Sequence, residues 1–192
     1  MANEKNEKQT ETISLVEAKQ AVELTARRLG LLHLSFARTL VDELGEKKGK
    51  ELIMKAIKDY GKRIGKKVRE GVIKQGLAPI PENYGVGKSR DLPEFGMHED
   101  TEGVEVGGEK RIRSYGCTMA KVWHEYGEDE LGRLYCYVDP AKYMAFNPDF
   151  KLIHIKALPD GNEYCELTVR PTTEQDRKDL AAKDTDLSCI DK

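Results

Sequence analysis

Residues 116–165 read GCTMAKVWHEYGEDELGRLYCYVDPAKYMAFNPDFKLIHIKALPDGNEYC, and the rest of the chain can be interpreted outward from them. The stretch holds three of the four cysteines, two of the four histidines and the single tryptophan. Asp139-Pro140 is typical of a helix start, with the aspartate as N-cap and the proline at the first helical position. Residues 159–162, Pro-Asp-Gly-Asn, are typical of a turn between two strands. The stretch therefore predicts short helices followed by a β-hairpin.

Three helices and two strands are predicted within this stretch and just beyond it. The helices are Cys117–Tyr126, Asp129–Val138 and Asp139–Phe146, and the strands are Lys151–Leu158 and Asn162–Arg170.

Alternation along the two strands predicts which side chains share a face of the hairpin. Matching apolar face to apolar face requires an odd-length turn and places Cys165 in the core. His154 then lies on the opposite face, near Glu166. Under this register His154 and Cys165 would not bind the same metal ion. The predicted core face consists of Ile153, Ile155, Ala157, Cys165, Leu167 and Val169.

Two long helices are predicted upstream, over residues 13–76. Ser14 and Glu17 have the spacing of a capping box, and apolar residues recur every three or four positions as far as Leu44. Gly45 ends the first helix, residues 46–48 are expected as the turn, and the second helix runs from about residue 46 to residue 75.

The second of these helices contains glycines at 61, 65 and 71. Each glycine weakens a helix by roughly 1 kcal/mol relative to alanine. Two of them, Gly61 and Gly65, are four residues apart and therefore share a face. Because glycine has no side chain, this spacing predicts that another backbone approaches the helix closely there.

Residues 77–100 are rich in proline and glycine, so a long loop is predicted. Loops of this length in compact domains are commonly lids or binding loops, and we expect residues 84–98 to cover part of the site. Residues 85–89, GVGKS, lack the full spacing of a phosphate-binding loop and follow no predicted strand. We therefore reject a nucleotide site.

A further hairpin is predicted from Glu102–Val106 and Glu109–Tyr115, joined at two glycines. The predicted fold class is α+β, with an N-terminal helical hairpin packed on a small antiparallel sheet of about four strands and short intervening helices. One domain is expected over residues 13–171. Residues 1–12 are expected to be a disordered arm, and residues 172–192 a charged tail or a short exposed helix.

Composition excludes several classes of function. The 192 residues include 32 basic and 34 acidic side chains, which are interspersed and leave a net charge of −2. This balance gives no sign of the positively charged surface that binds nucleic acid or an anionic membrane. No apolar run reaches membrane-spanning length, and the N-terminus has no signal-peptide core. We therefore expect a cytoplasmic protein whose cysteines are reduced thiols.

Cys117 is the first candidate for a catalytic residue. It follows a predicted strand and begins a predicted helix, where the helix dipole lowers the pKa of a thiol. His124 is seven residues further on and therefore on the same helical face. Cys136 and Asp139 are three residues apart and could also share a face. Two alternatives remain open: Cys117 as a small buried residue, and Asp139 as a helix N-cap only.

Other residues are candidates for substrate binding, each with a structural alternative. Trp123 and Tyr164 are expected to pack, with pocket walls as the second interpretation. Arg111 could receive a carboxylate, although exposed strand arginines are common. His98 lies in the long loop, where it is either a lid residue or simply exposed. His33 lies near the apolar stripe of the first helix and is expected to be a core histidine.

Three segments together resemble a known family. They are LVDELGEKKGKELIMKAIKDYGKRIGKKVREG, GCTMAKVWHEYG and LGRLYCYVDPAKYMAFNPDFKLIHIKALPDGNEYCEL. The combination of Cys136 with Asp139, Asn147-Pro148 and Gly161 to Cys165 is similar to the L-2-amino-thiazoline-4-carboxylic acid hydrolase family. The resemblance covers roughly residues 29–169. It implies hydrolytic opening of a 2-aminothiazoline ring to an N-carbamoyl-cysteine.

The last segment also resembles, more remotely, the vinyl-reductase-type ligand-binding domains of sensor proteins. Those domains often bind zinc through an acidic residue and a cysteine upstream of the final cysteine. Here His154 and Ala157 stand at the comparable positions, which disfavours a full zinc site.

The sequence is therefore consistent with two functions from different classes. The first is a hydrolase acting on a small cyclic C–N compound, and the second is a non-catalytic small-molecule-binding or sensor module. No cofactor is expected, with zinc as the remaining alternative. The expected partner is a small molecule, with neither nucleic acid nor membrane, and the chain could form a homo-oligomer.

Overall fold

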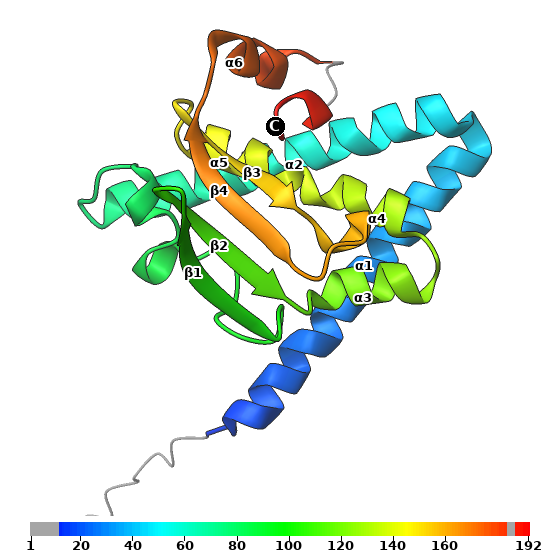
Figure 1. The fold of residues 1–192 in the computed structure, drawn as a ribbon, viewed down its shortest axis with the longest axis horizontal. Coiled ribbons are helices and arrows are strands. Elements are labelled where there is room, and N and C mark those ends of the chain that lie inside the picture. The colour runs from blue at the N-terminus through cyan, green and yellow to red at the C-terminus, as the bar shows by residue number, and fades with distance from the viewer. Residues whose placement is uncertain (1–11, 184–186) are drawn as a thin grey trace, which may run out of the picture.

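The computed structural model describes residues 12–183 and 187–192. The helices α1 (Leu15–Leu44) and α2 (Glu46–Lys74) form an antiparallel pair that meets at a sharp corner (Figure 1). Ser14 caps α1 in the predicted capping box, with the Glu17 amide donating to Ser14 Oγ at 3.2 Å. Gly45, with φ of 78°, is the whole turn, because α2 begins at residue 46. The predicted arm lies outside the described residues, except for residue 12.

Three short helices follow the first hairpin of the chain, and they have the predicted order. They are α3 (Thr118–Glu125), α4 (Asp129–Cys136) and α5 (Val138–Phe146). The prediction that Asp139 caps the last of them is wrong, because α5 begins one residue earlier and has no side-chain cap. The Asp139 carboxylate is thereby left available for other contacts.

Gly61 and Gly65 seat α5 directly on α2, as their spacing predicts. A Cβ atom on Gly61 would lie 2.7 Å from the Cβ of Ala141, and one on Gly65 would lie 2.0 Å from the carbonyl oxygen of Lys142. Such distances are far shorter than real contacts allow. The two glycines therefore set the position of α5 and of the side chains it carries.

The sheet consists of four antiparallel strands in the order β1-β2-β4-β3. The strands are β1 (Asp100–Val106), β2 (Glu109–Tyr115), β3 (Phe150–Lys156) and β4 (Cys165–Pro171). Helix α5 lies between α2 and β3, so the helices cover one face of the sheet (Figure 1). The α+β prediction, with helices packed on a four-stranded antiparallel sheet, is confirmed.

The predicted pairing of the last two strands holds beside the turn, where Lys156 pairs with Glu166, and is wrong further along the strands. Leu152 pairs with Val169 and His154 with Leu167, and a bulge follows between His154 and Lys156. Directly paired residues point to the same face, and Cys165 is two residues from Leu167. His154 and Cys165 therefore share the face that meets the helices. The bulge explains the error, since strict alternation fails where one strand has an extra residue.

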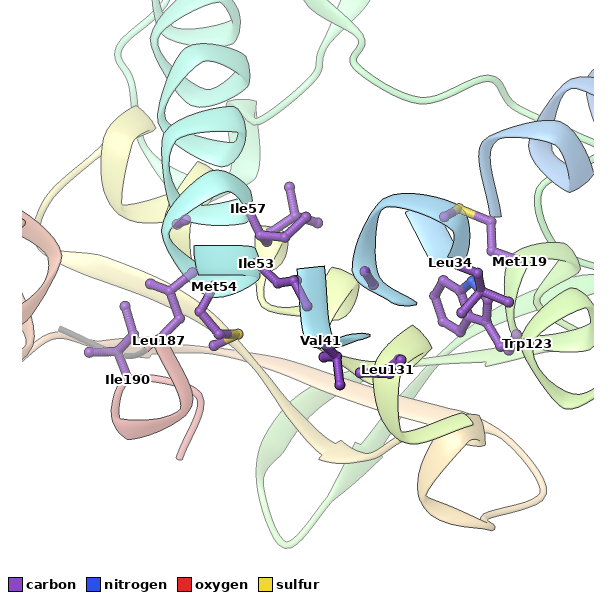
Figure 2. Packing of buried hydrophobic residues seen from close by; sticks show 14 of the residues in the cluster. Leu34, Val41, Ile53, Met54, Ile57, Met119, Trp123, Leu131, Leu187 and Ile190 are labelled. Atoms are coloured by element: carbon purple, nitrogen blue, oxygen red, sulfur yellow. The ribbon is translucent and has the colours of Figure 1, made fainter. Parts of the chain in front are cut away.

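The core lies between the helical pair and the shorter helices (Figure 2). Trp123 is 1% exposed, and Leu34 and Met119 lie beside it in the picture. No helix in the described ranges has the length and apolarity needed to cross a membrane.

Residues 172–183 contain a short and mostly exposed helix, one of the two expected forms, whereas residues 187–192 are more buried than their charge predicts. They form α6 (Glu174–Ala181) and a short turn, Leu187–Cys189. Leu187 and Ile190 are almost fully buried, and Figure 2 places them near Met54 of α2. Two apolar side chains thus anchor residues 187–192 to the main core.

Candidate functional site

A cluster of buried charges is centred on Asp139, in the first turn of α5. Its Oδ1 lies 2.9 Å from the Nζ atom of Lys142, and its Oδ2 lies 3.2 Å from the Nε2 atom of His154. Burial alone would raise the pKa of Asp139, but the two cations outweigh burial and hold it below its usual range. The carboxylate is therefore ionised and engaged on both oxygens.

Lys142 ties this cluster to the long loop before β1. Its side chain is 7% exposed, and Nζ also lies 3.3 Å from Asp91 Oδ2. Tyr84 donates a hydrogen bond to the same Asp91 oxygen at 2.9 Å and stacks on Tyr143. Burial alone would lower the pKa of Lys142, but Asp139, Tyr84 and Asp91 raise it well above its usual value. The loop thus supplies a carboxylate and a phenol to the site.

His154 extends the cluster to the end of the described chain. Its Nδ1 lies 3.1 Å from Asp191 Oδ1, and the other oxygen of Asp191 accepts from Arg133 Nη2 at 2.8 Å. Burial lowers the pKa of His154, but hydrogen bonds to Asp139 and Asp191 raise it to about 9. The imidazole is therefore a cation at neutral pH, held between two carboxylates.

The buried charges of this cluster balance. The anions are Asp91, Asp139 and Asp191, and the cations are Lys142, His154 and Arg133. Buried ions are tolerated when they are paired and hydrogen-bonded. One donor is an exception: Arg133 Nη1 is buried and has no hydrogen-bond partner among the described residues. We call these six residues the Asp139 cluster.

Three thiols that are far apart in sequence gather beside this cluster. Burial raises the pKa of Cys136 well above its usual value, Arg133 opposes the shift, and Cys117, Asp139 and Cys165 add to it. Cys165 accepts a hydrogen bond from the Leu158 amide at 3.3 Å, and burial raises its pKa to about 11. Asp139 also acts on all three thiols, raising the pKa of Cys117, Cys136 and Cys165.

Cys117 stands immediately before α3, at the helix start that the sequence predicts. Burial raises the pKa of its thiol, and the backbone amides of Ala120 and Met119 only partly offset this. The expectation that the helix start would lower this pKa is therefore wrong. Desolvation of a buried thiolate outweighs the helix dipole at this position.

His98 lies alongside Cys117 because the two chain segments run next to each other. The Thr118 amide donates to the Met97 carbonyl and the Glu99 amide to the Tyr115 carbonyl, each at 3.0 Å. Burial lowers the pKa of His98, and the charges of Asp139 and Lys142 are close enough to act on it. The His98 imidazole is thus near the Asp139 cluster, on a backbone segment that is hydrogen-bonded to the segment carrying Cys117.

A cavity of about 450 Å³ opens at this position. His98 and Thr118 line it, so it reaches the neighbours of Cys117 from outside. Its other lining residues come from α1, from the loop before β1, from the start of β1 and from α3, and they include Lys19, Glu23, Phe95, Gly96 and Lys121. Access from solvent to His98 therefore exists on this side.

The remaining candidates from the sequence lie elsewhere. The side chain of His124 is 84% exposed and contacts Asp129 at 3.1 Å, away from Cys117. Trp123 is buried in the core and donates to the Gly30 carbonyl. Arg111 contacts Glu166 at 2.6 Å, and Tyr164 lies under Arg113, on the face of the sheet opposite His154. His33 is a core histidine that contacts the Leu131 carbonyl at 2.9 Å.

Sequence reasoning missed most of the Asp139 cluster. Lys142 gave one usable signal, since it is a lysine between buried apolar positions of a short helix, three residues after an aspartate. Asp91, Arg133 and Asp191 gave none, because charged residues in loops and tails are usually solvated. His154 was assigned to the wrong face.

Cys117, Cys136 and Cys165 are not bonded to one another by disulfides. Within the described ranges, no group of three or more histidine, cysteine or acidic side chains is arranged to bind a metal ion. The reactive groups of the site include thiols, a neutral imidazole and a network of buried ion pairs.

Comparison with known proteins identifies one family. No curated protein and no solved structure matches the chain. The sequence model of the L-2-amino-thiazoline-4-carboxylic acid hydrolase family matches residues 25–169, which include Cys117, Asp139 and Cys165. Because the match extends over most of the chain, this protein belongs to the L-2-amino-thiazoline-4-carboxylic acid hydrolase family.

Proposed function

We propose that this protein is a hydrolase that opens a small cyclic C–N compound, with 2-aminothiazoline-4-carboxylate as the first candidate substrate. The observation that supports the proposal is that Cys117 and His98 lie on two hydrogen-bonded backbone segments near the buried Asp139 cluster, and that His98 lines a cavity. Membership of the family supports the substrate class.

The proposed nucleophile is the Cys117 thiol, with His98 as its general base. The resting thiol is protonated because burial raises its pKa, so it needs a base at the moment of attack. His98 is suited to this because burial lowers its pKa and leaves the imidazole neutral. Asp139 is already ionised and bound on both oxygens, which favours an electrostatic role over proton transfer.

The reaction would proceed in two balanced steps. The Cys117 sulfur attacks the ring carbon between nitrogen and sulfur, and its proton passes to His98. The ring carbon–sulfur bond breaks, and the leaving sulfur takes that proton. Water then attacks the same carbon, the bond to Cys117 breaks, and the thiol regains a proton. One water is consumed, and the product is an N-carbamoyl-cysteine.

A carboxylate on the substrate would need a cation. Arg111, the sequence candidate, is engaged by Glu109 and Glu166. Arg133 is better placed, because its buried Nη1 has no partner among the described residues and its charge acts on both Cys136 and Cys165. We propose that Arg133 receives the substrate carboxylate.

Ring opening releases a thiol, which a disulfide reagent detects directly. Wild-type protein should release thiol from 2-aminothiazoline-4-carboxylate, and Cys117→Ser should lose this activity while keeping its fold. Cys189→Ser is the matched control, because Cys189 is exposed and lies outside the site. His98→Gln should lower kcat by about 100-fold, the range of a lost general base. Full activity in Cys117→Ser would remove this residue from the mechanism.

A second candidate function is a small-molecule-binding module without turnover. It is favoured by the raised pKa values of all three clustered thiols, which leave no thiolate in the resting protein. Calorimetric titration separates the two functions. Binding of the thiazoline without thiol release, and with affinity altered in Cys117→Ser, would support the module and contradict the hydrolase.

A further inference from the structure

Asp191 is the most buried carboxylate of the site, with its side chain 1% exposed. Its Oδ1 accepts from the His154 backbone amide at 2.9 Å and lies 3.1 Å from the Nδ1 atom of the same residue. Its Oδ2 accepts from Arg133 Nη2 at 2.8 Å. Both oxygens are therefore committed to residues of the site.

The surrounding segment is built to hold this carboxylate in place. Leu187 is 1% and Ile190 0% exposed, and both lie near Met54 of α2 (Figure 2). Ile190 is adjacent to Asp191, so burying it fixes the backbone that carries the carboxylate. Burying two such side chains contributes several kcal/mol, at roughly 1.5–3 kcal/mol each.

His154 links Asp191 to Asp139, because each of its ring nitrogens contacts one of the two carboxylates. With Nδ1 held by Asp191, the ring presents Nε2 to Asp139 at 3.2 Å. A histidine ring bonded on one nitrogen has its orientation and protonation set by that bond. The chain of contacts from Asp191 therefore ends at Asp139, the carboxylate that raises the pKa of all three thiols.

We infer that Asp191, which lies outside the family match at residues 25–169, is a positioning residue of this site that holds the imidazole of His154 against Asp139. Its effect on turnover rests on the proposed function, whereas its hold on the imidazole does not.

Two carboxylates contact the imidazole of His154, and two cations contact those carboxylates. Asp139 on α5 and Asp191 contact the ring directly, while Lys142 and Arg133 act through those two carboxylates. Asp160 contacts the Nε atom of Arg133 at 3.1 Å, and its half-exposed side chain is bonded to Arg133 rather than to His154. Asp160 is therefore a matched control for the loss of a carboxylate beside Arg133.

The test is the titration of His154 by nuclear magnetic resonance, with the resonance assigned from a His154→Gln variant. In the wild type His154 should titrate near pH 9. In Asp191→Asn its pKa should fall by about one unit or more, as expected when a neighbouring opposite charge is removed. In Asp160→Asn it should stay as in the wild type. An Asp191→Asn protein whose His154 titrates like the wild type would overturn the inference.

Kinetics provide the second readout. With 2-aminothiazoline-4-carboxylate, Asp191→Asn should lower kcat by about 10-fold to 100-fold, because the imidazole of His154 is no longer held against Asp139. KM should rise as well, because Asp191 also contacts Arg133, the proposed ligand of the substrate carboxylate. Asp160→Asn should leave kcat unchanged. If the wild type shows no turnover, the proposed function fails, and the His154 titration still decides the role of Asp191.

A wild-type measurement covers the case in which Asp191→Asn fails to fold. At pH 7.5 the ring nitrogen shifts of His154 should show both nitrogens protonated, with a slowly exchanging Nδ1 proton. A neutral ring, or an Nδ1 proton in fast exchange with water, would show that Asp191 does not hold the imidazole of His154 in place.

Discussion

Burial, more than neighbouring charge, decides the state of the clustered thiols. Cys117, Cys136 and Cys165 each have a raised pKa, and burial is the largest cause in every case. Sequence reasoning identified Cys117 from its place at a helix start but could not know how deeply the thiol would be buried. Helix position is local and visible in the sequence, whereas desolvation depends on residues brought in from elsewhere.

The rate of alkylation of each cysteine should decrease as the burial of its thiol increases. With iodoacetamide at pH 7.5, the exposed Cys189 should react first and the three clustered thiols much more slowly. Cys165, with a pKa of about 11, would have roughly a hundredth of the thiolate of an ordinary cysteine. Mass spectrometry of peptides from a time course gives the order directly. Modification of Cys117 before Cys189 would show instead that the helix start dominates.

At the scale of single elements, the sequence predicted most of the architecture. Both long helices, the first hairpin and the three short helices lie within a few residues of their predicted bounds, because apolar periodicity and caps are local signals. The second hairpin had the right strands, and its register is wrong beyond the bulge between His154 and Lys156. Strict alternation does not reveal where a strand has an extra residue.

The contact of α2 with α5 yields a prediction about an element. Gly65→Ala should destabilise the protein by about 1–3 kcal/mol, because the new Cβ would meet the Lys142 carbonyl oxygen at 2.0 Å. The gain in helix propensity, roughly 1 kcal/mol, is too small to offset this. Urea unfolding measures the change.

Gly103→Ala in β1 is the matched control, because a Cβ there would meet nothing within 4 Å. It should change stability by no more than about 0.5 kcal/mol. A Gly65→Ala protein as stable as the wild type would show that α5 can shift without cost.

At the scale of the whole molecule, the site joins segments that are far apart in the chain. The long loop supplies Asp91 and His98, α5 supplies Asp139 and Lys142, and residues 187–192 supply Asp191. Pairings of this kind depend on the complete fold. This is why most of the Asp139 cluster could not be predicted, although the elements that carry it could.

The buried histidine makes stability depend on pH. The pKa of His154 is about 9 in the folded protein, against 6.5 for an ordinary histidine. A raised pKa stabilises the fold fully below pH 6.5, and this contribution is lost as pH rises through 9. It amounts to on the order of 3 kcal/mol. The urea midpoint should therefore fall between pH 6.5 and 9, and His154→Gln should lack this component. If the urea midpoint of His154→Gln falls between pH 6.5 and 9 as steeply as that of the wild type, other groups cause the pH dependence.

The anchoring of Leu187 and Ile190 has a consequence for biosynthesis. Cys117, Asp139 and His154 are all made before the carboxylate that holds the imidazole. At 5–20 residues per second, translation from His98 to Asp191 takes roughly 5 to 20 seconds. During that interval the growing chain carries its thiols without their finished electrostatic surroundings. The Asp139 cluster is therefore complete only after Asp191 has been synthesised and has docked against His154.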